Sequence, residues 1–208
     1  MMTELPILVG CEFSGVVTSA FRRHGVEAYS CDLLPTEGNP KWHLQMDIVQ
    51  ALQSCKWGGF ICFPPCTYLC NSGIRWLYNG GDKKNGKDPL RWLHMEDAVR
   101  FFLGSLLNRD IPHICIENPR MHPYAAKLVG VKPTQVVQPF MFGHNETKAT
   151  SLWLKGLPPL VPTKIVEGRT PRVHFESPGP DRWKRRSRTL TGLGEAMASQ
   201  WRKCFVEE

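Results

Sequence analysis

The chain has 208 residues, of which 42% are hydrophobic and 22% charged, as is typical of a globular protein. No apolar run reaches the ~18 residues of a membrane span, and the N-terminus lacks the basic and apolar segments of a secretory signal, so we expect a cytoplasmic protein without a membrane partner. The net charge of +7 favours a polyanionic partner such as nucleic acid.

Short apolar runs alternate with helical patterns along most of the chain. The patterns predict strands at 6–10, 26–32, 43–48, 59–63 and 112–118, later strand candidates at 134–138 and 151–155, and helices at 15–25, 92–107 and 193–204. This alternation favours right-handed crossover connections and an α/β fold with a mostly parallel sheet. In such a sheet, ligands bind beyond the carboxyl ends of the strands.

Polar or glycine-rich residues follow the predicted strands directly. In chain order they are Gly10 to Gly15, Asp32, Asp47, Pro64 to Cys66, and Glu117 with Asn118. Because the carboxyl ends of parallel strands share one edge of the sheet, we expect these loops to meet there. Considered alone, Glu117 is either part of a strand-end turn or a fixed acid that bonds a ring nitrogen of a ligand.

The stretch 58–73, GGFICFPPCTYLCNSG, holds three of the eight cysteines and admits three interpretations. A metal cage is disfavoured because Cys-x3-Cys-x3-Cys has no second ligand pair, and a disulfide is disfavoured in a reducing compartment. Cys62 lies inside an apolar strand. Cys66 follows two prolines at the ligand-binding edge and is either a positioned nucleophile or an ordinary loop cysteine. No role is assigned to Cys70, and no metal is expected.

Two segments interrupt the alternation. Residues 78–89 are glycine-rich and charged, which predicts a mobile loop, and residues 156–181 are rich in proline and basic groups, which suggests a small insert or lobe. The basic run 181–188 is either a solvated flexible face or a phosphate-binding strip. The candidate nucleic-acid-binding residues are Arg75, Lys83, Lys84, Arg182, Lys184, Arg185 and Arg186.

Taken together, ILVGCEFSGVVTSAFRRHGVEAYSCD, MDI, GGFICFPPCTYLCNSG and ICIENP resemble, in order and distance, the DNA cytosine carbon-5 methyltransferases. The resemblance covers roughly residues 6–120 and resumes at 138–155 and 187–202. It implies a Rossmann-like fold that binds S-adenosyl-L-methionine, with helices on both faces of a mostly parallel sheet. The chain looks like a minimal, phage-type member of that family.

The resemblance also implies roles for single residues. Cys66 is expected to add to carbon 6 of cytosine, so that carbon 5 can attack a methyl group. Glu117 is expected to contact N3 and the exocyclic amine, and Asn118 to hold the Cys66 loop or the base. A base then removes the carbon-5 proton. Lys148 offers the positive charge of the family's Gln-Arg-x-Arg element.

On the cofactor side, the loop after the first strand is expected to wrap the methionine part, with Glu12 suited to its ammonium group. Asp32 is expected to bind the ribose hydroxyls and Asp47 the adenine amino group. The full set of predicted cofactor residues is Gly10, Cys11, Glu12, Phe13, Ser14, Gly15, Asp32, Leu33, Asp47, Ile48, Pro64, Ser187 and Thr189.

The chain departs from the family pattern at Thr67, where the family has glutamine, and in the length of its recognition region. We expect a catalytic domain at 1–155, a short basic insert at 156–186 in place of a recognition domain, and a closing helix at 187–208. Few side chains remain to read base edges, so low or very short sequence specificity is expected. The expected partner is DNA, single-stranded or as a duplex with a flipped cytosine, bound by a monomer or weak dimer.

Other functions remain open on the sequence. One is a related enzyme that modifies RNA or a cytosine nucleotide. Another is a relative that binds nucleic acid or the cofactor without turnover. An amino-group methyltransferase also uses a Pro-Pro turn, but Phe63 and Cys66 fit its pattern poorly.

Overall fold

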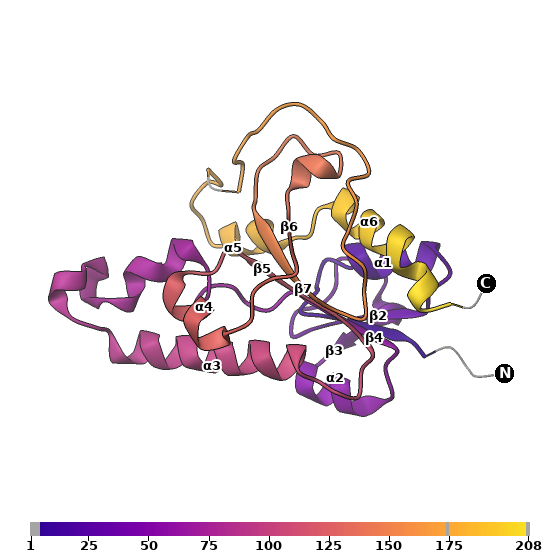
Figure 1. Cartoon of the computed structure of the whole chain (residues 1–208), viewed down its shortest axis with the longest axis horizontal. Helices are drawn as coiled ribbons and strands as arrows, with labels where there is room; N and C mark the ends of the chain where they lie inside the picture. The colour runs from indigo at the N-terminus through magenta and orange to yellow at the C-terminus, as the bar shows by residue number, and fades with distance from the viewer. Residues whose placement is uncertain (1–4, 174, 207–208) are drawn as a thin grey trace.

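A single mixed sheet organises the part of the chain that the computed structural model describes, residues 5–173 and 175–206 (Figure 1). Its seven strands run in the order β3-β2-β1-β4-β5-β7-β6. They are β1 Ile7–Gly10, β2 Ala28–Asp32, β3 His43–Gln45, β4 Gly59–Cys62, β5 His113–Pro119, β6 Gln135–Val137 and β7 Thr150–Lys155. Neighbours from β3 to β5 pair in parallel, and β7 is antiparallel to both β5 and β6. The predicted Rossmann-like α/β class is confirmed.

Helices cover both faces of this sheet (Figure 1). The α-helices are α1 Val16–Arg23, α2 Ile48–Ser54, α3 Pro89–Leu106, α4 Pro123–Val129, α5 Arg182–Ser187 and α6 Thr191–Trp201. Short 3-10 helices occur at η1 Pro40–Trp42, η2 Asn71–Leu77, η3 Asn79–Gly81, η4 Lys83–Asn85, η5 Pro139–Met141 and η6 Arg202–Cys204. The core on one face packs α1 and α6, and the core on the other packs α2, α3 and α4.

The alternation of β1 explains why two cores form. Ile7 and Val9 point into the cluster that contains Phe21 and Trp201, whereas Leu8 points into the cluster on the opposite face. All of β1 is buried, as a central parallel strand requires. Because both faces of β1 are covered, its sequence does not alternate between apolar and polar residues.

Helix starts agree with local capping rules. Asp88 precedes α3, and its Oδ1 accepts a hydrogen bond from the N–H of Arg91 at 3.0 Å, with Pro89 at the first helical position. His122 precedes α4 and accepts from the N–H of Ala125 at 3.1 Å. These two caps set the first residues of α3 and α4.

One sequence expectation is made more specific here and another is corrected. Residues 78–89, predicted to be a mobile loop, contain the short helices η3 and η4, and the side-chain amide of Asn79 donates to the carbonyls of Asn85 (3.1 Å) and Lys87 (3.2 Å); their mobility stays a prediction. The third strand ends at Gln45, earlier than predicted, because Asp47 already caps α2. Part of the basic run 181–188 forms α5.

Residues 156–173 form an arch beside segment 139–147 (Figure 1). Isolated parallel bridges join Phe142 to Lys164 and Glu146 to Thr170. The arch then leads into α5 and α6. No helix of the described residues is long and apolar enough to cross a membrane. The division into three domains stays a prediction.

Candidate active site

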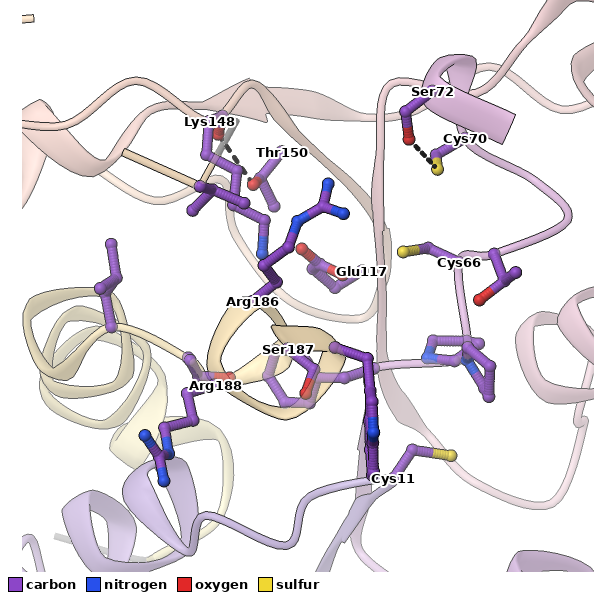
Figure 2. A pocket seen from close by; sticks show the side chains of 18 of the residues that line it. Cys11, Cys66, Cys70, Ser72, Glu117, Lys148, Thr150, Arg186, Ser187 and Arg188 are labelled. Carbon is purple, nitrogen blue, oxygen red and sulfur yellow. Dashed lines mark hydrogen bonds between the residues drawn. The ribbon is translucent and has the colours of Figure 1, made fainter. Parts of the chain in front are cut away.

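A cavity of about 900 Å³ opens at the carboxyl ends of the parallel strands (Figure 2). It brings together predicted site residues that are far apart in the chain. These are Cys11, Phe13, Asp32, Leu33, Pro64, Cys66, Glu117, Lys148, Arg186, Ser187 and Thr189. The strand ends therefore do converge, as the alternating pattern predicts.

One end of the cavity carries a thiol, a carboxyl group and an ammonium group. Figure 2 shows the Cys66 sulfur, the Glu117 carboxyl and the Lys148 side chain pointing toward the same space. Glu117 lies near the end of β5 and is only 7% exposed. Its burial raises the pKa of the carboxyl group, while the positive charge of Lys148 lowers it. This end can donate a proton or hydrogen bond to a ring nitrogen beside a nucleophile.

The turn that presents Cys66 is held at both ends. The N–H of Phe63, just after β4, donates to the carbonyl of Gly10 at 3.0 Å. The N–H groups of Leu69 and Cys70 both donate to the carbonyl of Cys66 at 3.0 Å. With Pro64 and Pro65 between these anchors, the thiol has little freedom to leave the cavity wall.

Cys70 is a neighbour of Cys66 that sequence reasoning missed. A hydrogen bond to Cys70, followed by burial, raises the pKa of the Cys66 thiol well above its ordinary value. Donation from Cys66 lowers the pKa of Cys70 to about 5, against the effect of burial. The Cys70 sulfur also lies 3.1 Å from Oγ of Ser72. The four-residue spacing was the available signal, but it becomes meaningful only once 66–70 is known to form a turn.

The other end of the cavity is suited to a nucleoside. Asp32 ends β2, and its Oδ1 accepts from the N–H of Leu34 at 3.0 Å. Phe13 and Leu33 supply apolar surface next to it, and Leu33 is 71% exposed. The Lys184 ammonium lies 5.3 Å from the centre of the Phe13 ring. Asp32 thus retains an oxygen that can accept from ligand hydroxyls.

The shape of the loop after β1 depends on close packing beneath it and on its backbone angles. A Cβ at Gly10 would lie 2.8 Å from both Ile48 and Phe60, so a side chain does not fit there. Gly15 has a φ of 66°, and Cys11 has a φ of 57° although it is not glycine. Gly10 and Ile48 are packing residues beneath the loop after β1, whereas the Cys11 side chain lines the cavity.

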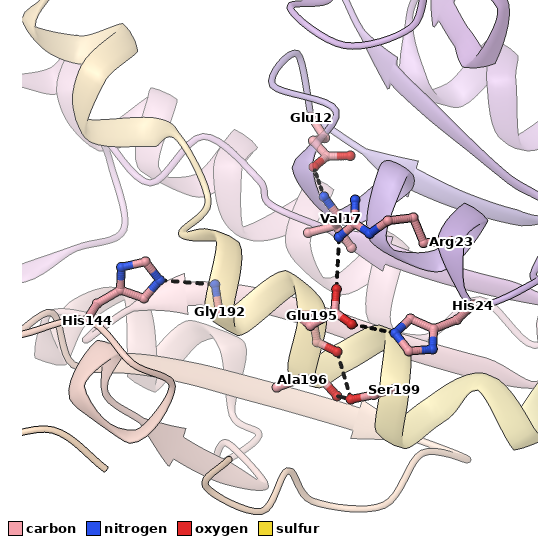
Figure 3. Close-up of polar contacts among 9 residues, drawn as sticks. All are labelled: Glu12, Val17, Arg23, His24, His144, Gly192, Glu195, Ala196 and Ser199. Carbon is pink, nitrogen blue, oxygen red and sulfur yellow. Dashed lines mark hydrogen bonds and ion pairs between the residues drawn. The ribbon is translucent and has the colours of Figure 1, made fainter. Parts of the chain in front are cut away.

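Glu12 does not face the cavity, contrary to the sequence expectation. Its Oε1 accepts from the N–H of Val17 at 2.6 Å (Figure 3). Its Oε2 accepts from the hydroxyl (2.7 Å) and the N–H (3.2 Å) of Thr18. Ser14 also turns inward, with its hydroxyl 3.4 Å from Oε1 of Glu12. Both carboxylate oxygens are used at the start of α1, so Glu12 positions the loop and is not placed to bind an ammonium group.

Asp47 and Asn118 also lie outside the cavity lining. Asp47 is exposed, and its Oδ1 accepts from the N–H of Val49 at 2.8 Å, which caps α2. Asn118 is fully buried on β5, and its amide donates to the carbonyl of Pro119. Its Oδ1 has no hydrogen-bond partner among the described residues. Asn118 can support the strand end but does not reach a ligand in this arrangement.

The basic run 181–188 divides into paired and cavity-facing side chains. Arg185 donates to Glu176 at 2.5 Å, Lys184 lies 3.5 Å from Glu37, and Arg182 donates to the carbonyl of Glu176 at 2.8 Å. Arg186 instead points into the cavity beside Glu117 (Figure 2). Its Nε is buried without a partner among the described residues. The basic run 181–188 is therefore not a strip in which every cation is unpaired and available to phosphate.

The other predicted nucleic-acid contacts lie outside the cavity. The Arg75 guanidinium stacks 4.7 Å from the ring centre of Trp76, and Trp76 lines the cavity mouth with 47% of its surface exposed. Lys83 and Lys84 are exposed on η4. No group of His, Cys, Asp or Glu in the described part of the chain is arranged to hold a metal ion.

Comparison with known proteins gives remote structural likeness. No protein-family model matches this sequence, and no curated protein matches it. An E. coli prophage protein described as a DNA modification methyltransferase aligns with a TM-score of 0.45 and 14% identity over 84% of this chain and 55% of its own. Dnmt2 of S. pombe gives 0.42 and 13%, over 85% and 55% of the two chains.

A third structure, a DNMT2 mutant of Spodoptera frugiperda, gives a TM-score of 0.39 and 13% identity, over 80% of this chain and 54% of its own. The present chain thus spans about half the length of these solved structures. Structural likeness at this level of sequence identity bears only on the fold. The fold class follows independently from the strand order and register.

Proposed function

We propose that this protein transfers a methyl group from S-adenosyl-L-methionine to carbon 5 of cytosine in DNA, with transient addition of Cys66 to carbon 6. The observation that carries the proposal is the single cavity, which has Cys66 and Glu117 at one end and Asp32 with Phe13 at the other. A nucleophile beside a buried acid is the pair that this addition needs, and the opposite end fits a nucleoside.

The cofactor proposal rests on the chemistry of the cavity wall. Asp32 has one carboxylate oxygen bonded to the backbone and one left for ribose hydroxyls, while Phe13 and Leu33 offer apolar surface for adenine. Ser187 and Thr189 close the cavity from the other side. When bound, the cofactor supplies an electrophilic methyl group. Since Glu12 and Asp47 face elsewhere, neither belongs to the proposed contacts.

The residues of the chain then have separable tasks in the reaction. The Cys66 sulfur attacks carbon 6 of the ring, and the ring electrons move toward N3. Glu117, whose pKa is raised by burial, donates to N3 and stabilises the charge that develops there. Elimination of the thiol after loss of the carbon-5 proton returns Cys66 to its starting state.

Arg186 and Lys148 supply the positive charge at this end. Arg186 enters the cavity from α5, and its buried Nε lacks a partner among the described residues, which leaves it available to the ring carbonyl or the target phosphate. Residues 156–186 are proposed to take the place of a recognition domain in a monomer or weak dimer. Few base contacts are then available, and specificity is low.

A covalent-trapping experiment tests the proposal. Incubation with labelled S-adenosyl-L-methionine and DNA that contains 5-fluorocytosine should give a stable protein–DNA adduct, and Cys66→Ala should abolish it. Transfer of the label by Cys66→Ala would overturn the thiol mechanism. RNA and cytidine nucleotides that carry the same fluorinated base are tested in parallel. If either one is trapped in preference to DNA, that compound class, and not DNA, is the substrate.

The cofactor site has its own test. Asp32→Ala removes the acceptor for ribose hydroxyls and should weaken binding of S-adenosylhomocysteine by roughly 1–3 kcal/mol in calorimetry. Asp47→Ala is the matched control, because Asp47 lies at a neighbouring strand end but outside the cavity. Equal losses for both variants would contradict the assignment of Asp32.

A further inference from the structure

We infer that the mouth of the cavity binds single-stranded DNA, with the bases on either side of the target stacked on Trp76 and Trp183 and a neighbouring phosphate bound by Arg91. These three residues, the mouth cluster, all line the cavity, and none of them has a task in the proposed reaction. The inference rests on the proposed function and deepens it, because that function does not decide between a single strand and a duplex.

Two indole rings of the mouth cluster are open to solvent. Trp76 is 47% exposed and Trp183 is 56% exposed, although large aromatic side chains normally contribute to the core. Neither ring packs against another aromatic ring of the described residues. Flat apolar surfaces left open at the entrance of a cavity indicate a stacking partner that the protein itself does not supply.

A packed junction between η2 and α3 positions Trp76 and Arg91. The residue after Trp76 is Leu77, which is 2% exposed, and its carbonyl accepts from the indole N–H of Trp92 at 2.9 Å. Arg91 precedes Trp92 on α3, and its guanidinium lies 4.8 Å from the centre of the Tyr68 ring. Both side chains of the mouth cluster are therefore carried by a supported scaffold, as a binding site requires.

Trp183 comes from α5, which is fastened by the residues on either side of the indole. Arg182 donates to the carbonyl of Glu176 at 2.8 Å, and the Lys184 ammonium lies 3.5 Å from the Glu37 carboxylate. These contacts hold the helix while the indole itself lines the cavity. A ring whose position is set in advance loses less conformational entropy when a base stacks on it.

Arg91 gives the mouth a positive charge that no acid in the described part of the chain neutralises. It takes part in no ion pair there, and its Nε is buried without a hydrogen-bond partner. A guanidinium of this kind is suited to a phosphate group, which accepts two parallel N–H bonds. At the thiol end of the cavity, the cations Lys148 and Arg186 face the single acid Glu117 (Figure 2). The charges therefore favour a polyanion as the occupant.

The chemistry of the mouth cluster favours a single strand over a duplex. In a duplex the face of each base is covered by its neighbours in the stack, and a protein reaches base edges and phosphates. In a single strand the faces are free to stack on aromatic side chains, and this binding tolerates any sequence. Two exposed indoles beside an unpaired guanidinium therefore fit a single strand, and sequence-tolerant stacking agrees with the low specificity proposed above.

The first experiment measures the coupling between each indole and a flanking base. Labelled single-stranded DNA with thymine at the target position carries an abasic site on the 5′ side, on the 3′ side or on neither, so that bases change while the phosphates stay. In fluorescence anisotropy, each abasic site should weaken binding to the wild type by about 5- to 100-fold, the scale of one stacked base. Trp76→Ala and Trp183→Ala should each become insensitive to one of the two abasic sites.

The controls separate stacking from general damage. Trp76→Phe and Trp183→Phe keep an aromatic face and should keep the sensitivity to both abasic sites. Trp42→Ala removes an indole outside the cavity lining and should keep it as well. Abasic sites that weaken binding to Trp76→Ala and Trp183→Ala as much as to the wild type would overturn the inference.

A duplex of the same sequence tests the form of the strand. At high salt, where the contribution of the phosphates is reduced, the duplex should bind at least about tenfold more weakly than the single strand, because its flanking bases cannot stack on the protein. A duplex that binds as tightly as the single strand under these conditions would refute the inference.

Arg91→Gln should change the salt dependence and not the stacking. Loss of one phosphate contact should flatten the slope of log affinity against log salt by about 0.7 for a single strand, while the abasic sites still weaken binding as in the wild type. Arg100→Gln is the matched control, because Arg100 lies on the same helix, pairs with Asp97 and does not line the cavity. An unchanged slope in Arg91→Gln, or an equal change in both variants, would contradict the phosphate contact of Arg91.

These measurements separate the failure of this inference from failure of the proposed function, since the strands contain no target cytosine and no cofactor is added. Coupling of both indoles to flanking bases in a protein that forms no adduct with any 5-fluorocytosine substrate would refute the proposed function and leave the mouth cluster standing. Adduct formation with single-stranded DNA at a rate that abasic flanks do not alter would refute the inference alone.

Discussion

Glu12 stabilises the start of α1 with a carboxyl group that is only 3% exposed. The first N–H groups of a helix have no partners within the helix, and Glu12 accepts from those of Val17 and Thr18. These donors favour the charged form, but burial outweighs them and raises the pKa of Glu12 to about 7. The Glu12 carboxyl group therefore loses its proton and becomes charged as the pH rises through about 7.

Glu12 should make stability depend on pH in a defined direction. The folded pKa lies above the unfolded value of 4.5, so the folded state binds the proton more tightly, and stability falls as pH rises from about 4.5 through about 7. The full effect is about 3 kcal/mol, from the pKa difference. Urea unfolding at several pH values should show this slope, and Glu12→Gln should remove it. A wild type whose free energy of unfolding is flat over that interval would contradict the raised pKa.

At the scale of elements, α6 is held against segment 139–147 by a close approach at Gly192. The N–H of Gly192 donates to Nε2 of His144 at 3.0 Å (Figure 3). A Cβ at this position would lie 1.8 Å from the carbonyl oxygen of Phe142, which is backbone and cannot move easily. The glycine therefore sets how near the closing helix comes to the cavity wall.

Gly192→Ala should destabilise the protein by about 1–3 kcal/mol through this clash. Gly104→Ala is the matched control, because Gly104 is an exposed residue of α3 with nothing within 4 Å of its added Cβ. That control should stabilise by about 0.5–1 kcal/mol through helix propensity. Urea unfolding of both variants measures the difference, and equal effects would show that the α6 contact is not the cause.

The position of α5 depends on ion pairs with the loop after β2. Oε1 of Glu37 accepts from Arg188 at 2.6 Å and lies 3.5 Å from the Lys184 ammonium. Arg186, Ser187 and Arg188 line the cavity, so these contacts hold one wall of the site. These ion pairs lower the pKa of the Glu37 carboxyl group, and the hydrogen bond from Arg188 has the largest effect. Because the paired side chains are partly exposed to solvent, they contribute little to global stability.

Glu37→Gln should loosen α5 while it leaves the fold intact. Hydrogen exchange at the amides of 182–188 should quicken by about fivefold, which corresponds to about 1 kcal/mol for an exposed ion-pair network. The global unfolding midpoint should change little. Asp97→Asn, which breaks the exposed pair with Arg100 on α3, is the control and should not affect these amides. Exchange that is unchanged in Glu37→Gln would show that α5 is held by other contacts.

At the scale of the whole molecule, the sheet and the meeting of its loops could be predicted because they depend on local patterns. Apolar runs such as 6–10 and 59–63 read as buried strands, and polar residues such as Asp32 and Glu117 at their ends fall on one edge. Directions of single side chains could not be predicted. Glu12 turns toward α1 because the loop geometry offers it unpaired N–H groups, which the sequence does not reveal.

The same limit explains the errors in the charged segments. A six-residue helix such as α5 has no apolar periodicity, and its ion pair with Glu37 joins residues that are distant in the chain. The position of Cys70 on the cavity wall depends on a turn that two prolines permit but do not dictate. Long-range pairings of this kind change which cations remain available to a polyanion, although the net charge of +7 is unaltered.

Nucleic-acid binding should therefore depend more on η4 than on the exposed side of α5. Lys83 and Lys84 are exposed and take part in no ion pair within the described residues, whereas Lys184 and Arg185 are paired with acids. A cation already paired in the protein releases fewer counterions when it meets a phosphate. Lys83→Gln and Lys84→Gln, made together, should flatten the dependence of log affinity on log salt by about 0.9 per lysine for duplex DNA or about 0.7 for a single strand.

The matched variant is Lys184→Gln with Arg185→Gln, which removes the same charge but should change the slope by less. Fluorescence anisotropy with a labelled duplex and a labelled single strand at several salt concentrations measures both slopes. A larger change in the α5 variant would mean that its ion pairs with Glu37 and Glu176 open when nucleic acid binds.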